Sequence, residues 1–95
     1  MKDYKEQYRE IADEFKKYLK GWEVVLHTGT HDFVSVEDKT GFKTVIDIST
    51  GLSREARKIA FTNRNIFGCL RKVPRASYAT DKNIKRFADF LNALP

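Results

Sequence analysis

Cysteine is almost absent from this sequence, since Cys69 is the only one among 95 residues. A single cysteine forms no internal disulfide, whereas secreted domains of this size usually need several bridges. We therefore expect a reducing, cytoplasmic location. The first ten residues mix acids with bases and do not have the pattern of a signal peptide. No apolar run approaches the roughly 18 residues that a membrane-spanning helix requires, so we expect no contact with a membrane.

Acidic residues are scarce in the second half of the chain. Residues 1–51 hold eight Lys or Arg against ten Asp or Glu, a net charge of −2. Residues 52–95 hold ten against three, a net charge of +7. Between Ala56 and Asn83 the only acidic residue is Asp81. A field of one sign on part of a small domain attracts polyanions or an acidic protein partner.

Catalytic and metal-binding motifs are also lacking. His27 and His31, with Asp32 as a third ligand, have the spacing that presents ligands to one metal on a helix, but they flank a predicted turn. A hairpin there could bring the two rings close enough only for adventitious metal binding. Asp32, Glu37 and Lys39 follow the order of acids and lysine in metal-dependent nucleases. They lie too close together, and Lys39 falls in a turn, where its position is not held rigidly. We predict no catalytic residues, no metal, no cofactor and no enzymatic activity.

The residues that are present predict a single small domain over residues 1–95. Hydrophobic residues make up 41% and charged residues 33%, a mixture typical of folded globular chains. Apolar side chains spaced three and four apart predict an amphipathic helix over residues 3–20, which Gly21 would end. This aromatic stripe is Tyr4, Tyr8, Ile11, Phe15, Tyr18 and Trp22. We expect it to pack on a sheet, and a stripe wider than that sheet would favour a homodimer.

The hydrophobic period changes to two after Gly21. Alternation over residues 22–27, 33–37 and 42–48 predicts three strands, separated by turns at 29–32 and 38–41. Because each connection is short, the strands should form an antiparallel meander.

The C-terminal half favours helices. Ala56, Ile59 and Ala60 share one helical face, which predicts a helix from Ser53. This helix either ends near Thr62, kinks at residues 63–65 or continues through Leu70. A last helix is predicted to begin after Thr80. The predicted fold is α+β: an N-terminal helix, a three-stranded antiparallel β-meander, and two C-terminal helices packed on one face of the sheet.

Basic side chains in this half form the most promising constellation. On the predicted helices they lie opposite the apolar faces, and Phe61 projects among them. Such a surface neutralises phosphates by releasing counterions, and an exposed ring can stack on bases. The sequence therefore predicts a small nucleic-acid-binding accessory domain, for DNA or RNA. The predicted binding residues are Arg54, Arg57, Lys58, Phe61, Arg64, Arg71, Lys72, Arg75, Lys82, Lys85 and Arg86.

Two other interpretations use the same segment. A protein-binding module or inhibitor could clamp an acidic protein partner, with Phe61 and the aromatic stripe as anchors. A helix-turn-helix over residues 53–73 fits poorly, because Asn63 and Asn65 fall where apolar residues belong.

Overall fold

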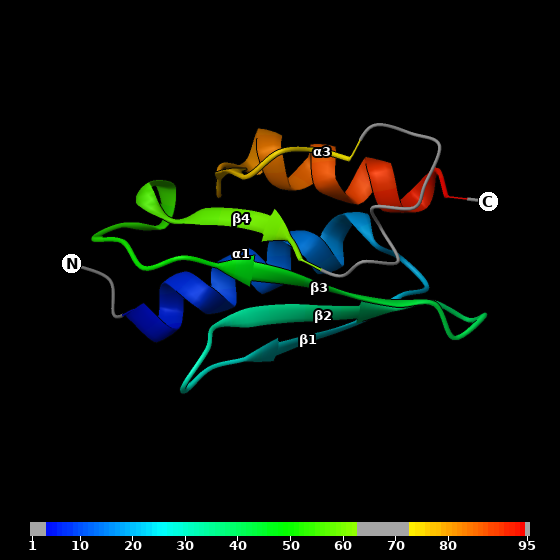
Figure 1. Ribbon diagram of the computed structural model, residues 1–95, viewed down its shortest axis with the longest axis horizontal. Helices are drawn as coiled ribbons and strands as arrows, with labels where there is room; N and C mark the ends of the chain where they lie inside the picture. Colours follow the sequence, from blue (N-terminus) through cyan, green and yellow to red (C-terminus); the bar gives the residue numbers. More distant parts are fainter. Residues whose placement is uncertain (1–3, 63–72, 95) are drawn as a thin grey trace.

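A computed structural model describes residues 4–62 and 73–94 of the chain. It has an N-terminal helix, a five-stranded antiparallel sheet and a C-terminal helix, which confirms the α+β class (Figure 1). The elements are α1 (Tyr4–Tyr18), β1 (Glu23–His27), β2 (Phe33–Glu37), β3 (Lys43–Ile48), the 3-10 turn η1 (Arg54–Ala56), β4 (Lys58–Phe61), β5 (Ser77–Tyr78) and α3 (Asp81–Asn92). None of the helices in these two ranges is both long and apolar enough to cross a membrane.

The sheet is a meander in which the strands follow one another in the order β1-β2-β3-β4-β5. The predicted meander of β1, β2 and β3 is confirmed, with Val34 lying opposite both Leu26 and Ile46. The turn between β2 and β3 depends on Asp38, whose carboxylate accepts hydrogen bonds from the backbone N–H groups of Thr40 and Phe42 at 2.9 and 3.0 Å. A further hydrogen bond from the Thr40 hydroxyl lowers the pKa of Asp38.

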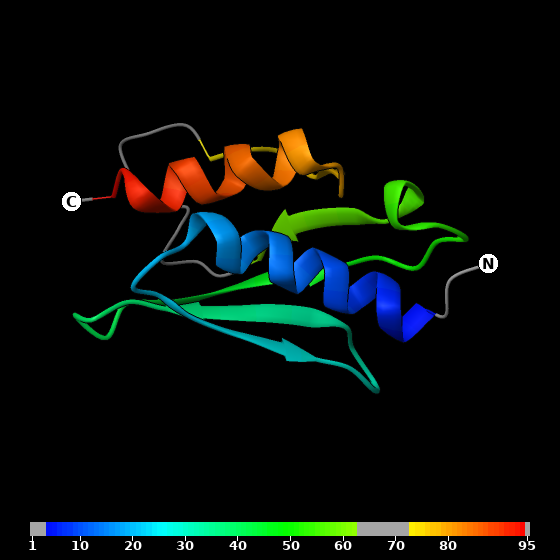
Figure 2. The ribbon, with the colours of Figure 1, turned by 180° about the vertical axis from the view of Figure 1, so that it is seen from behind.

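Both helices lie side by side on one face of the sheet, as Figure 2 shows from their side. Alternate strand residues such as Val34 and Val36 point into this layer and are fully buried, as are Ile11 and Phe15 of α1. The stripe predicted on the first helix is therefore mainly core. The opposite face of the sheet, here called the open face, is not covered by either helix (Figures 1 and 2).

Helix α3 begins where the sequence predicts. The Thr80 side chain is its N-cap and accepts a hydrogen bond from the Asn83 backbone N–H at 3.3 Å. Its apolar face, which includes Ile84, Phe87 and Leu91, is buried.

The helix predicted from Ser53 is wrong. Residues 54–56 form only the short turn η1, and residues 58–61 form strand β4 on the edge of β3. Burial of the side chains repeats every two residues in this segment: Arg57, Ile59 and Phe61 are buried, while Lys58 is exposed on the open face. Within the described residues, η1 and β4 replace the first of the two predicted C-terminal helices, α3 is the second, and β4 and β5 raise the three predicted strands to five. The possible continuation through Leu70 lies outside the described residues.

Candidate nucleic-acid interface

Six of the ten predicted basic residues lie around strand β5 and the start of α3. Register pairing places Tyr78 of β5 opposite Lys58 of β4, and the Lys58 Nζ atom lies 5.3 Å from the centroid of the Tyr78 ring. Arg54 of η1 donates from Nε to the carbonyl oxygen of Ala79 at 3.2 Å. Side chains that are 24 residues apart in the sequence, Arg54 and Tyr78, thus share one edge of the sheet.

Helix α3 adds cations to the same edge. The Arg86 guanidinium donates to the Ser77 hydroxyl, which itself donates to the Arg75 carbonyl oxygen at 2.8 Å. Asn83 ties the first turn of the helix to the strand by donating from Nδ2 to the Tyr78 carbonyl oxygen at 2.9 Å. Lys82, which is exposed, lies on the outer side of this turn. A groove of about 650 Å³ lies along this face of α3 and is lined by Thr80, Lys82, Asn83, Lys85, Arg86 and Asp89.

We call this region the β5 surface. It consists of Arg54, Lys58, Arg75, Tyr78, Lys82, Lys85 and Arg86.

Some of its charge is neutralised locally. Arg54 forms an ion pair with Asp81, and Lys85 pairs with Asp89 at 2.9 Å, which raises the pKa of Lys85. The remaining four cations have no carboxylate within ion-pair distance in the part of the chain that the structure describes; they are Lys58, Arg75, Lys82 and Arg86. The β5 surface therefore retains an excess of positive charge.

Two predicted binding residues belong to the interior instead. Arg57 is only 4% exposed, and Phe61, at 5%, stacks on Phe87 with 4.8 Å between the ring centroids. Both were expected to project from a helix, and both point into the core because they lie at the inward positions around β4. The expectation of an exposed Phe61 is wrong. Three other predicted residues, Arg64, Arg71 and Lys72, lie outside the described residues.

Buried Arg57 organises a polar network between the sheet and α1. Its guanidinium donates to the Gln7 Oε1 atom at 2.9 Å and to the Tyr8 hydroxyl oxygen at 2.8 Å. The Tyr8 hydroxyl donates in turn to the Asp32 carboxylate at 2.5 Å. Burial raises the pKa of Tyr8, and its hydrogen bond to Asp32 raises it further. A buried guanidinium needs several acceptors, and this one finds them within the protein, so it is not available to a ligand.

Tyr78 is the surface residue that the sequence reasoning missed. Its side chain is 51% exposed at the edge of the sheet. An aromatic residue in a short stretch without periodicity gives no sign of its exposure, because most tyrosines are at least partly buried. Its ring is exposed, as the sequence had predicted for Phe61.

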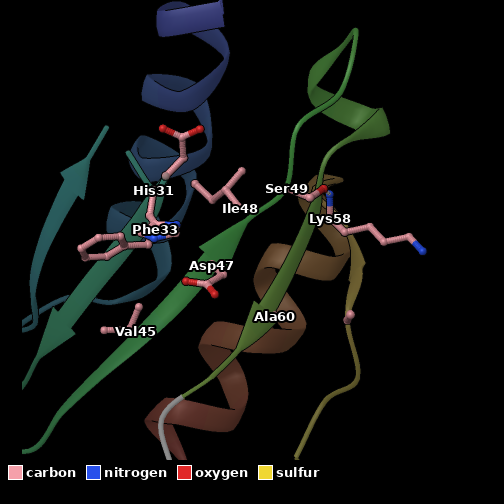
Figure 3. Close-up of a pocket in the computed structure, with 10 residues that line it drawn as sticks. His31, Phe33, Val45, Asp47, Ile48, Ser49, Lys58 and Ala60 are labelled. Carbon is pink, nitrogen blue, oxygen red and sulfur yellow. Dashed lines mark hydrogen bonds between the residues drawn. The ribbon is translucent and has the colours of Figure 1, made fainter. Parts of the chain in front are cut away.

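The open face carries a second hollow beside the β5 surface. Its volume is about 630 Å³, and Figure 3 shows Phe33, Asp47 and Lys58 around it, from β2, β3 and β4. The Lys58 side chain extends away from Asp47 (Figure 3). Next to this hollow, the His27 ring stacks on the Phe33 ring with 4.5 Å between the centroids. The His27 Nε2 atom lies 3.1 Å from the Ser35 hydroxyl oxygen. The Asp47 carboxylate makes this hollow less suitable for phosphate than the β5 surface.

The residues that were considered for metal or nuclease chemistry do not gather into a site. Within residues 4–62 and 73–94, no three His, Cys, Asp or Glu side chains are placed to hold one metal ion. The Asp32 carboxylate accepts a hydrogen bond from the Tyr8 hydroxyl. Glu37 is the last residue of β2 and lies opposite Lys43 of β3.

Comparison of this chain with protein-family models, with curated proteins and with solved structures found no match.

Proposed function

We propose that this protein binds nucleic acid, without catalysis, by docking the β5 surface on the phosphate backbone. The observation that carries the proposal is the convergence of cations from η1, β4, the segment before β5 and α3 on one edge of the sheet. These residues are spread over more than 30 positions of the sequence, from Arg54 to Arg86. Folding therefore brings together basic residues that are far apart in the sequence and produces an excess of positive charge on one surface.

Phosphate neutralisation explains what this surface can do. Four of its cations have no carboxylate partner among the described residues, so each can replace a counterion on the nucleic acid. For four such contacts, the logarithm of the association constant should fall with the logarithm of salt concentration with a slope of about −4 on duplex DNA and about −3 on a single strand.

The Tyr78 ring supports contact with an unpaired base. Its exposed side chain lies at the edge of the open face, and the cation of Lys58 lies beside it. Stacking of a base on an exposed ring tolerates any sequence, because every base has a π-face. We therefore expect single strands to bind through both phosphate contacts and stacking.

The alternative partner, an acidic protein, loses several of the anchors that were assigned to it, although Tyr4 of the aromatic stripe is 54% exposed. Phe61 is in the core, and so are Tyr8 and Phe15 of the aromatic stripe. Protein interfaces rely on buried aromatic anchors, whereas nucleic-acid backbones are bound largely by cations. The composition of the β5 surface therefore favours nucleic acid.

Fluorescence anisotropy with a labelled duplex and labelled single strands of DNA and RNA tests the proposal. The combined substitutions Arg75→Glu and Lys82→Glu reverse two exposed cations for which the described residues provide no carboxylate partner. We expect the affinity to fall by at least about tenfold at low salt and the salt slope to become shallower by about two.

A matched control changes the charge equally elsewhere. Lys20→Glu with Lys39→Glu alters two exposed lysines, one after α1 and one in the turn between β2 and β3. Their effect should stay within about threefold, because only long-range attraction changes. Equal losses in both double variants, or no binding of the unmodified protein to any of the probes at low salt, would refute the proposal.

A further inference from the structure

Strand β1 forms a long free edge of the sheet. It pairs with β2 on one side, and no described strand follows it on the other. Figures 1 and 2 show it at the border of the ribbon, on the side opposite α3. An edge strand presents unpaired backbone N–H and C=O groups that can accept another strand. Proteins usually protect such edges with lysine, proline or a bulge, and residues 23–27 contain no lysine or proline.

The sequence of this edge is complementary to itself. If a second copy of β1 lies antiparallel with Val25 opposite its own equivalent, then Glu23 of each copy lies opposite His27 of the other. On the face covered by helices, Val24 would lie opposite Leu26. The pairing therefore places Glu23 opposite His27 twice. At the three remaining positions it places apolar residues opposite apolar residues. Cross-strand pairs of this kind stabilise a sheet, whereas like charges opposite one another destabilise it.

This register is also the one that the two faces require. Side chains alternate along a strand, so a shift by one residue would turn the helix-covered face of one copy to the open side of the other. A shift by two would keep the faces but leave Glu23 opposite Val25. Pairing centred on Val25 alone keeps both faces and places each Glu23 opposite a His27.

Exposure and charge agree with this pairing. Val25 is 38% exposed at this edge, and a neighbouring strand would cover part of its side chain. The β1 edge also belongs to residues 1–51, whose net charge is −2, so that two copies would meet away from their basic halves.

We infer that two copies of this chain pair through β1 across a two-fold axis to form one continuous sheet of ten strands. Both layers of helices would lie on the same side of that sheet. The two β5 surfaces would lie at its far ends, because each is on the edge opposite β1. The partner is thus a second copy of the chain, and the interface is the β1 edge.

Sedimentation and light scattering over a range of concentrations test this inference. One chain has a mass of 11.0 kDa, so the expected species at high concentration has twice that mass. Val25→Lys places two lysines opposite one another at the centre of the pairing and should raise the dissociation constant of the dimer at least about tenfold. Because the Val25 side chain lies on the open face, circular dichroism should show that the variant still folds.

Tyr78→Lys is the matched control, since it adds the same charge at the other edge of the sheet. It should leave the dimer unchanged. If Tyr78→Lys dissociates the dimer and Val25→Lys does not, the pairing uses β5 and the inference is wrong. A protein that is monomeric at every concentration up to the millimolar range would also overturn it.

A charge exchange tests the register. His27→Glu places a carboxylate opposite Glu23 of the second copy and should weaken the dimer. Adding Glu23→Lys to that variant restores opposite charges across the interface and should strengthen the dimer again. A loss of local packing around Phe33 would not be rescued in this way, because the second substitution lies elsewhere on the strand. Failure of the rescue would refute the pairing centred on Val25.

Discussion

The two edges of this sheet differ in length, charge and neighbours. The β1 edge has five residues, of which only Glu23 carries a full charge, and it lies beside α1. The β5 edge has two residues and is surrounded by the six cations of the β5 surface. A long edge with little charge can accept another strand, whereas a short edge among cations discourages strand pairing and attracts anions. One sheet thus offers two different kinds of contact, and substitutions that affect one edge should spare the other.

Phe61→Ala should produce the largest loss of stability. The Phe61 ring fills the space between β4 and α3, where it packs on Phe87 and Phe90 with centroids 4.8 and 5.6 Å away. Removing a buried phenyl ring leaves a cavity, so we expect the free energy of unfolding to fall by about 4 kcal/mol in urea titrations. Tyr78→Ala, one strand further toward the edge, should cost less than about 1 kcal/mol. Similar losses in both variants would mean that the edge is as well packed as the core.

Arg57→Ala should have the next largest effect. This change removes the donor that joins the residue before β4 to Gln7 and Tyr8 of α1. We expect a loss of about 3 kcal/mol from these two buried hydrogen bonds and the lost packing on the Tyr8 ring, measured by urea denaturation. Lys58→Ala is the control, because the next residue has the same charge but is exposed. A stability close to that of the unmodified protein in Arg57→Ala would show that the network contributes little.

Tyr78→Ala should have the smallest effect of these three variants, and mainly on binding. Loss of one stacked base costs about 1 to 3 kcal/mol, so affinity for a single strand should fall roughly tenfold in anisotropy titrations. Its salt slope should be unchanged, because no cation is removed. Tyr78→Phe should bind as the unmodified protein does. An equally large loss in Tyr78→Phe would assign the role to the hydroxyl group and not to the ring.

The first half of the fold was predictable because its periodicity is clean. In α1, Tyr8, Ile11 and Phe15 repeat at helical spacing, and in β2 and β3 buried residues alternate with residues of the open face. The start of α3 was predictable for a chemical reason, since Thr80 has the side chain that a helix N-cap requires.

Strand β4 was mistaken for a helix because two residues break the alternation of apolar and polar side chains that is typical of a strand. Arg57 occupies an inward position but counts as polar, and Ala60 faces outward but counts as apolar. If Arg57 is counted as polar and Ala60 as apolar, the apolar residues of this segment include Ala56, Ile59 and Ala60, which have the spacing of a helix. Only the partners of Arg57, which come from α1 some 50 residues away, reveal that its side chain is inside. Strand β5 is too short to produce any period.

The candidate site was predictable in its charges and not in its geometry. Lys82, Lys85 and Arg86 lie opposite the apolar stripe of a well-predicted helix, and they are exposed as expected. Arg86 contacts β5 at Ser77, and Lys58 contacts it at Tyr78. This arrangement depends on the pairing of β4 with β5, and neither strand has a sequence pattern that predicts it.

The shortness of β5 also bears on how this edge responds to a ligand. Its pairing with β4 comprises two register positions, Lys58 with Tyr78 and Ile59 with Ser77, and the Ala79 N–H donates to the Arg57 carbonyl oxygen next to them. With so few hydrogen bonds, amide hydrogens here should exchange with solvent before those of β2 and β3, since short peripheral elements open at low free-energy cost. The edge that carries the positive charge is therefore also the one that can most readily adjust its shape, and a bound anion would slow that exchange by holding the strand in place.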